Sequence, residues 1–186
     1  MKMRLRLNII TELLIITALC STSCGQINQV KRVMREFSNT TIVVPKGMMM
    51  VDGQSLKPFK DTSLKAKLIF YFDESSCSSC QVAHLSDLLN LYEIGDKSGK
   101  YEVLIIFSPP HEDLSGLIEE LKLRDFEHPV IVDSNKEFEI GNPSMPSDNR
   151  FHTYLIDEKG LPLFIGNPNG SEELYGLFMK AVSRLK

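Results

Sequence analysis

Two of the four cysteines have the spacing of a reactive dithiol pair. Cys77 and Cys80 are separated by Ser78 and Ser79, so both thiols lie within one turn if the segment is helical. An apolar run precedes the motif and an amphipathic pattern follows it, which predicts that Cys77 opens a helix. The unpaired N–H groups and the positive end of the dipole at a helix N-terminus stabilise a thiolate. We therefore expect Cys77 to be an exposed attacking nucleophile and Cys80 to be a shielded resolving thiol.

This spacing suits thiol–disulfide exchange. A mixed disulfide forms on the attacking cysteine and is released when the resolving cysteine attacks it. Zinc ribbons and structural disulfides share the C-x-x-C spacing, but zinc normally needs a second such pair or a histidine pair, which the sequence lacks. We predict catalytic roles for Cys77 and Cys80, no bound cofactor and no resident metal. Asp73 and Glu74, just before the motif, either oppose thiolate formation or form a solvated turn.

The elements that hold the motif follow an α/β alternation. Residues 68–72 and 103–107 are unbroken apolar runs, typical of parallel strands buried on both faces. Residues 77–94 between them show helical spacing, which predicts a right-handed βαβ unit. The remaining predictions are a helix with its apolar stripe at 114–121, a short strand at 130–132, a hairpin at 154–165 with Gly160 in its turn, and a closing helix capped by Ser171.

Two further elements are expected before the motif. Residues 41–44 and 48–51 favour a strand pair, and the three methionines at 48–50 are interpreted as packing residues rather than as a thioether copper site. Residues 27–37 have loose helical spacing and predict a short stalk helix.

The N-terminus has the pattern of an export signal. Lys2, Arg4 and Arg6 precede an apolar run at 13–19, which is far shorter than the ~20 residues needed to span a bilayer. Small residues directly before Cys24, with a glycine after it, resemble the lipobox of bacterial lipoproteins, in which the cysteine is lipidated and becomes the mature N-terminus. The alternative is a free or disulfide-bonded Cys24 near the end of a soluble or uncleaved export segment.

The composition fits one globular domain with a short appendage. The chain has 186 residues, of which 42% are hydrophobic and 24% are charged, with a net charge of -3. A pI near 5.8 without a basic tract argues against nucleic-acid binding. We divide the chain into a signal peptide at 1–23, a lipidated cysteine with a spacer and stalk helix at 24–39, and one domain at 40–186.

With its motif between a buried strand and a helix, the chain resembles the thioredoxin-like superfamily, in particular the exported, membrane-tethered TlpA/ResA-like oxidoreductases. The resemblance covers roughly residues 40–186. Besides the motif, residues 153–160 are similar to the family's cis-proline strand and hairpin, and residues 128–133 look like the extra strand of the TlpA and peroxiredoxin branches. The resemblance implies a thioredoxin-like α/β fold, with a central mixed sheet flanked by helices and an N-terminal strand pair. It also implies redox activity on the periplasmic side of a bacterial membrane or at the cell surface.

The chain departs from the family pattern around the motif. Ser76 stands where the family usually has tryptophan and Ser79 where it usually has proline, while Tyr71 takes the place of a proton-relaying acid. The cis-proline position falls on Phe151 or His152, and a cis bond before a non-proline residue costs ~3 kcal/mol, so we expect a trans loop and a reshaped substrate groove. Our candidate groove residues are Ser78, Ser79, Phe151 and His152.

Three functions from different classes remain open. The first is a tethered thiol–disulfide oxidoreductase, by analogy a reductase or isomerase rather than a primary oxidant, with protein disulfides, an upstream electron donor and the membrane at Cys24 as its partners. The second is a copper or thiolate-metal chaperone that uses Cys77, Cys80 and His152, because the fold would bring His152 over the motif. The third is a non-catalytic lipoprotein whose C-x-x-C forms a structural disulfide.

Overall fold

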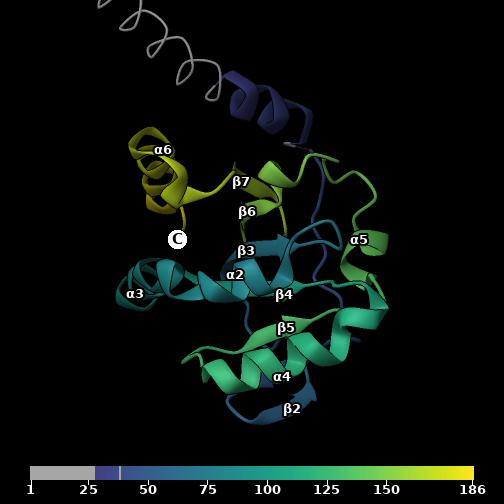
Figure 1. Ribbon diagram of the computed structural model, residues 1–186. Helices are drawn as coiled ribbons and strands as arrows, with labels where there is room; N and C mark the ends of the chain where they lie inside the picture. The colour runs from purple at the N-terminus through teal and green to yellow at the C-terminus, as the bar shows by residue number, and fades with distance from the viewer. Residues whose placement is uncertain (1–27, 38) are drawn as a thin grey trace, which may run out of the picture.

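The computed structural model describes residues 28–37 and 39–186, which fold around one mixed sheet. The sheet has seven strands in the order β2-β1-β5-β4-β3-β6-β7 (Figure 1). β4 pairs in parallel with both β3 and β5, and the pairs toward either end of the sheet are antiparallel. The strands are β1 (Met49–Asp52), β2 (Ser55–Pro58), β3 (Ala66–Phe72), β4 (Tyr101–Phe107), β5 (Val130–Val132), β6 (Thr153–Ile156) and β7 (Pro162–Ile165).

Helices flank this sheet and close its core. Figure 1 shows α4 beside the β5 and β1 end of the sheet and α6 beside the β7 end, and both helices contact the strands they lie against. No described helix is long and apolar enough to cross a membrane. The helices are α2 (Ser78–Ala83), α3 (Leu89–Ser98), α4 (Leu114–Arg124), α5 (Glu137–Gly141) and α6 (Glu172–Ser183), with the 3-10 turns η1 (Leu85–Leu88), η2 (His111–Asp113), η3 (Asn149–Phe151) and η4 (Pro168–Gly170).

The βαβ unit around the motif is confirmed, but its helix is divided. In place of one helix over 77–94, the chain forms α2, then η1, then α3. The spacing of the buried residues explains the break, because their three-residue recurrence matches the period of a 3-10 helix. These residues are Val82, Leu85, Leu88 and Leu91.

The N-terminal strand pair is present, with different bounds from those expected. β1 pairs with β2 across a tight turn in which Gly53 has a φ of 55°, and residues 41–44 belong to no strand. Individual hydrogen bonds hold the 41–44 segment instead of a strand ladder. Ile42 N donates to Gly160 O at 2.8 Å, and the Asn142 side chain accepts from the N–H of Val43 and donates to its carbonyl. This segment therefore satisfies its main chain outside the sheet.

The strands and longer helices after the βαβ unit agree with the sequence predictions, and one short α-helix is new. The hairpin of β6 and β7 turns at Gly160, whose φ is 82°, and Ser171 caps α6 by accepting a hydrogen bond from Leu174 N at 3.2 Å. The new element is α5, whose first N–H groups donate to the buried Asp133 carboxylate at 2.8 and 2.9 Å. A carboxylate at that point satisfies the orphan donors of the short helix.

A helix at 28–37 is present, and it packs into the domain. Val30, Val33 and Phe37 are buried in the core, and the Phe37 ring stacks on Tyr154 with 5.8 Å between centroids. The helix is therefore part of the domain and does not stand apart as a stalk. The expected signal peptide at 1–23 and Cys24 lie outside the described residues.

Candidate functional site

Cys77 and Cys80 form a disulfide at the N-terminus of α2, directly beyond the end of β3. Cys77 is the N-cap residue, its sulfur accepts a hydrogen bond from Cys80 N at 3.3 Å, and the two Cα atoms are 5.3 Å apart. Both cysteine residues are exposed, so the expectation that Cys80 would be shielded is wrong. The neighbouring Ser76, Ser78 and Ser79 are too small to cover the pair. An incoming substrate therefore finds both positions accessible.

The turn that leads from β3 to Cys77 is organised by Asp73. Its carboxylate accepts hydrogen bonds from Ser75 N at 3.0 Å, Ser75 Oγ at 2.7 Å and Ser76 Oγ at 3.0 Å. Burial raises the pKa of Asp73, but these hydrogen bonds and the nearby His152 imidazole outweigh burial, and the pKa lies below its usual value. Asp73 is thus a structural anchor of the motif rather than part of a freely solvated turn, since its side chain is 18% exposed.

His152 connects this turn to the loop before β6. The side chain is 5% exposed, with Nδ1 lying 3.5 Å from the Asp73 carboxylate and Nε2 lying 2.8 Å from Pro146 O. Because a carbonyl can only accept, Nε2 carries a proton in this arrangement. The His152 carbonyl also accepts from Tyr71 N at 2.9 Å. His152 therefore braces the motif through Asp73, and no hydrogen bond or ion pair joins it to either cysteine in the part of the chain that the structure describes.

The donor set expected for a metal chaperone does not assemble. Within residues 28–37 and 39–186, no group of three or more His, Cys, Asp or Glu side chains could hold a metal ion. Cys77 and Cys80 are joined to each other, and His152 is engaged with Asp73 and Pro146.

Tyr71 stands at the position where thioredoxins often carry an acid. It is buried beside Phe138 and His152, with ring centroids 4.8 and 5.5 Å away. Burial raises the pKa of Tyr71 to about 12, so its hydroxyl stays protonated at neutral pH. Tyr71 therefore cannot serve as the carboxylate base that the family often places here.

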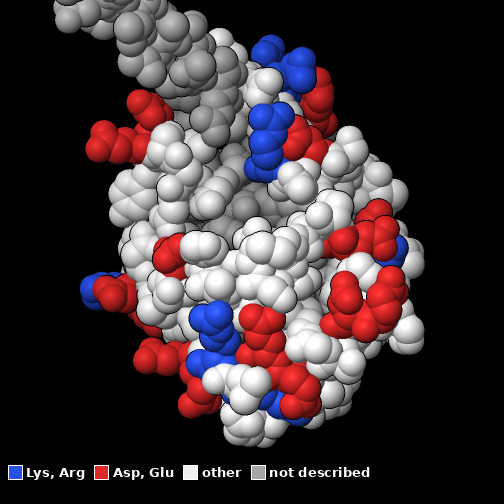
Figure 2. Space-filling view, viewed as in Figure 1, with Lys and Arg blue, Asp and Glu red and all other residues white. Residues whose placement is uncertain are grey.

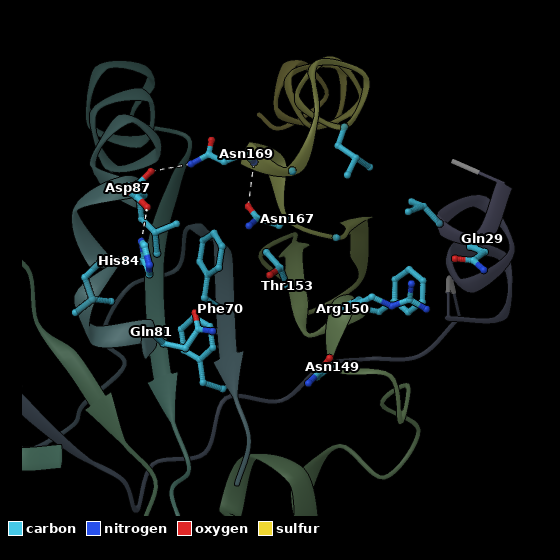
Figure 3. A pocket seen from close by; sticks show the side chains of 18 residues that line it. Gln29, Phe70, Gln81, His84, Asp87, Asn149, Arg150, Thr153, Asn167 and Asn169 are labelled. Carbon is cyan, nitrogen blue, oxygen red and sulfur yellow. Dashed lines mark hydrogen bonds and ion pairs between the residues drawn. The ribbon is translucent and has the colours of Figure 1, made fainter. Parts of the chain in front are cut away.

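Phe151 lines a different cavity from His152. The Phe151 cavity, about 490 Å³, lies between α2 with η1 and the η3, η4 and α6 side (Figure 3). Its walls include Phe70 and Leu85, and the carboxamides of Gln81, Asn149 and Asn169 lie around it. His152 lines a separate cavity of about 580 Å³ beside α5. The described loop has no cis peptide bond. The consecutive side chains of Phe151 and His152 line different cavities.

Ser78 and Ser79 line a third cavity, together with Cys77. This cavity of about 450 Å³ also receives Glu112 and Asp113 from η2, which follows β4. Sequence reasoning missed these two acids, although a signal existed. β3 and β4 are parallel, so the loops that follow their carboxyl ends must meet at the same edge of the sheet. The four groove candidates therefore border three cavities around the motif rather than one groove.

Comparison with known proteins supports the fold. No family model matches the chain, and no curated protein matches its sequence. The exposed lipoprotein thioredoxin of Streptococcus pneumoniae strain TIGR4 has a similar structure, with 19% identity and a TM-score of 0.50 over 74% of this chain and 98% of that one. A thioredoxin-like protein in its oxidised form shows 17% identity and a TM-score of 0.48, over 82% of this chain and 100% of that one. A thioredoxin-like protein from Porphyromonas gingivalis shows 19% identity and a TM-score of 0.46, over 79% and 94%.

The strand order and the pneumococcal likeness together define an α/β protein with a thioredoxin-like fold, as the sequence resemblance implied. Within that fold, the exposed Cys77–Cys80 pair is consistent with thiol–disulfide redox activity.

Proposed function

We propose that the protein is a thiol–disulfide oxidoreductase that reduces disulfides of exported proteins while lipidated Cys24 tethers it to a membrane. The observation that carries the redox part is the exposed Cys77–Cys80 disulfide at the start of α2, directly after the buried strand β3. The sulfurs lie just beyond the end of β3, at the edge of the sheet, and face solvent. A disulfide of purely structural use has no need of that exposure.

The reaction begins with the reduced pair. The Cys77 thiolate attacks one sulfur of a substrate disulfide, a mixed disulfide forms, and the other substrate sulfur leaves as a thiolate. The Cys80 thiolate then attacks the Cys77 sulfur, which closes the Cys77–Cys80 disulfide and releases the second substrate thiolate. Two electrons pass to the substrate, and its two thiolates take up the protons that the cysteines released. An external dithiol must then reduce the pair again.

The charges around Cys77 support the reducing direction. Glu112 and Asp113 line the same cavity as Cys77 and have no basic partner among the described residues, whereas Glu74 on the same cavity pairs with Lys136. Unpaired carboxylates oppose a nearby thiolate by Coulomb repulsion. α2 has six residues and its first turn contains no acid or base that would alter this balance. Strong oxidants of this kind have a strongly stabilised reduced form, so carboxylates that oppose the thiolate shift a pair toward giving up its electrons.

The cavity beside Phe151 supports docking of a polypeptide next to the disulfide. Gln81, the residue after Cys80, lies on its wall, and the surrounding carboxamides can both donate to and accept from an extended main chain (Figure 3). Its volume of about 490 Å³ and its aromatic floor suit an apolar side chain of the substrate.

The tether and the exported location are supported by the N-terminal pattern that ends at Cys24. The pneumococcal thioredoxin with a similar structure is described as an exposed lipoprotein, which supports the same arrangement for this chain. Two or more acyl chains hold a protein firmly at a membrane, where one chain gives marginal binding.

The reduction potential tests the proposed direction. The full chain in detergent is equilibrated with varied ratios of reduced to oxidised dithiothreitol. Free thiols are then alkylated, and mass spectrometry gives the fraction of protein in which the pair is reduced. We expect reversible reduction of the Cys77–Cys80 pair at a potential near that of thioredoxin, about -270 mV. A pair that fails to exchange with dithiothreitol is a structural disulfide, and a potential above about -150 mV marks an oxidant; either result contradicts the proposal.

A further inference from the structure

The cavity that contains Cys77 carries charge of one sign. Three carboxylates line it, from Glu74 on the motif side and from Glu112 and Asp113 on η2, and no Lys, Arg or His of the described residues does so. Figure 2 shows Asp and Glu side chains gathered at the right of the view, with a basic side chain beside them, where α5 and the start of α4 lie in Figure 1. A substrate segment that approaches the disulfide from this side meets a negative surface.

The carboxylates of Glu112 and Asp113 have no hydrogen-bond or ion-pair partner among the described residues that would give them a structural role. Both are exposed, and neither side chain makes a hydrogen bond or ion pair with any residue in the described ranges. Asp113 is the N-cap residue of α4, yet its carboxylate makes no capping hydrogen bond. Glu74 differs, since Lys136 Nζ pairs with its carboxylate. Two uncompensated carboxylates therefore face the cavity that contains the reacting sulfur.

The acids near the cavity on the other side of the motif have basic partners. Asp87 on its wall lies 3.0 Å from His84, and Arg150 pairs with Asp148 at 2.6 Å. The acids near this cavity therefore differ from Glu112 and Asp113 on the Cys77 side.

We propose that Glu112 and Asp113 are specificity-determining residues that favour substrate disulfides flanked by lysine or arginine. This inference rests on the proposed function and uses the same exchange step, in which Cys77 attacks and the substrate gains two electrons. A cationic flank is drawn to the carboxylates, which raises the rate of encounter and fixes the orientation. Inside the cavity the same cation offsets their repulsion of the Cys77 thiolate.

The test is single-turnover exchange between the reduced full chain and two disulfide-bonded peptides, one with lysines and one with glutamates beside the cysteine. Reduced protein is mixed with each peptide at low salt, and the second-order rate constant is followed by fluorescence dequenching. The variant is Glu112→Gln with Asp113→Asn. The matched control is Glu172→Gln with Glu173→Gln, which also removes two acids from the start of a helix but lies outside the Cys77 cavity.

The expected result is a rate ratio of about fivefold or more in favour of the lysine peptide, which falls toward one in the cavity variant and is kept in the control. Added salt should reduce the ratio, because the Debye length is about 8 Å at physiological ionic strength. Equal rates at low salt, or a preference that the cavity variant retains, overturn the inference and leave the proposed function intact. Absence of exchange with both peptides contradicts the proposed function itself. Circular dichroism confirms folding of each variant, and single Glu112→Gln protein replaces the double variant if the latter unfolds.

Discussion

At the scale of single residues, the motif is held by a short chain of polar contacts that begins at Pro146. His152 bonds the Pro146 carbonyl, Asp73 lies beside His152, and Ser75 and Ser76 bond Asp73. Ser76 directly precedes Cys77, so the position of the disulfide depends on a loop that follows α5. These contacts give Asp73 and His152 a positioning role in place of the metal-ligand role that the sequence left open for His152.

The depressed pKa of Asp73 predicts a pH-dependent contribution to stability. A carboxyl group whose pKa is lower in the folded state stabilises the protein above its unfolded-state pKa, and that stability is lost as the pH falls through the folded-state pKa. Asp73→Asn should therefore lower the free energy of unfolding at pH 7 by about 1–2 kcal/mol, since it replaces charged hydrogen bonds by neutral ones.

Urea unfolding of both proteins between pH 7 and pH 2 measures this effect. The difference between Asp73→Asn and the parent should stay constant above about pH 5 and shrink below about pH 4. Asp96→Asn, at an exposed position on α3, serves as the control and should change stability by no more than about 0.5 kcal/mol. A difference that grows toward acid pH would contradict this account of Asp73.

The place of the two cysteines in the fold could be predicted from the sequence, whereas the surroundings of each could not. Spacing alone places Cys77 at a helix start, because the strand before it and the helix after it have clear patterns. The exposure of Cys80 depends on which residues pack over it, and the three neighbouring serines give no sequence signal of this. The pairing of Asp73 with His152 joins residues 79 positions apart and leaves no local pattern (152 minus 73).

At the scale of elements, strong periodicity gave correct strands and helices, and weak periodicity gave errors of extent. β3 and β4 are long apolar runs, and α6 combines a cap, first-turn acids and a clear stripe, so all three were predictable. The division of 77–94 into three helices follows the three-residue recurrence of its buried residues, whereas its apolar positions in the sequence also fit one continuous helix.

The strand pair shows how turn chemistry decides between alternatives. The prediction joined two apolar runs across Pro45 and Gly47, whereas the chain turns at Gly53 and Gln54 and makes β2 from an exposed segment. A glycine at the first position of a two-residue loop is a hairpin signal, and it outweighs hydrophobicity here. α5 escaped prediction because five residues are too few for a periodic pattern.

At the scale of the whole molecule, the topology brings the charged loop of η2 to the disulfide. β3 and β4 lie side by side and run the same way, so the segments after them converge at one edge of the sheet. The helix at 28–37 packs against residues of β6 and β7, and its Gln29 and Val30 line the Phe151 cavity, whose wall also includes Gln81 beside the disulfide.

The proposed tether at Cys24 predicts a lipid-dependent location for the full chain. Cells that express it are labelled with a traceable fatty acid and separated into membrane and soluble fractions. We expect label on the membrane-bound protein and loss of both the label and the membrane location in Cys24→Ser, because this variant removes the proposed lipid anchor. Label that survives in Cys24→Ser would contradict lipidation at this residue, and Cys77→Ser serves as the cysteine control.

Trapping of mixed disulfides tests the central claim most directly. In Cys80→Ser the attacking sulfur remains and the resolving sulfur is absent, so a substrate attacked by Cys77 stays bound through a disulfide. In cells that express the full-length variant, we expect adducts with exported proteins that disappear on reduction and that do not form with Cys77→Ser. Failure of Cys80→Ser to form any adduct, or equal adducts with Cys77→Ser, would show that Cys77 is not the attacking nucleophile of a thiol–disulfide oxidoreductase.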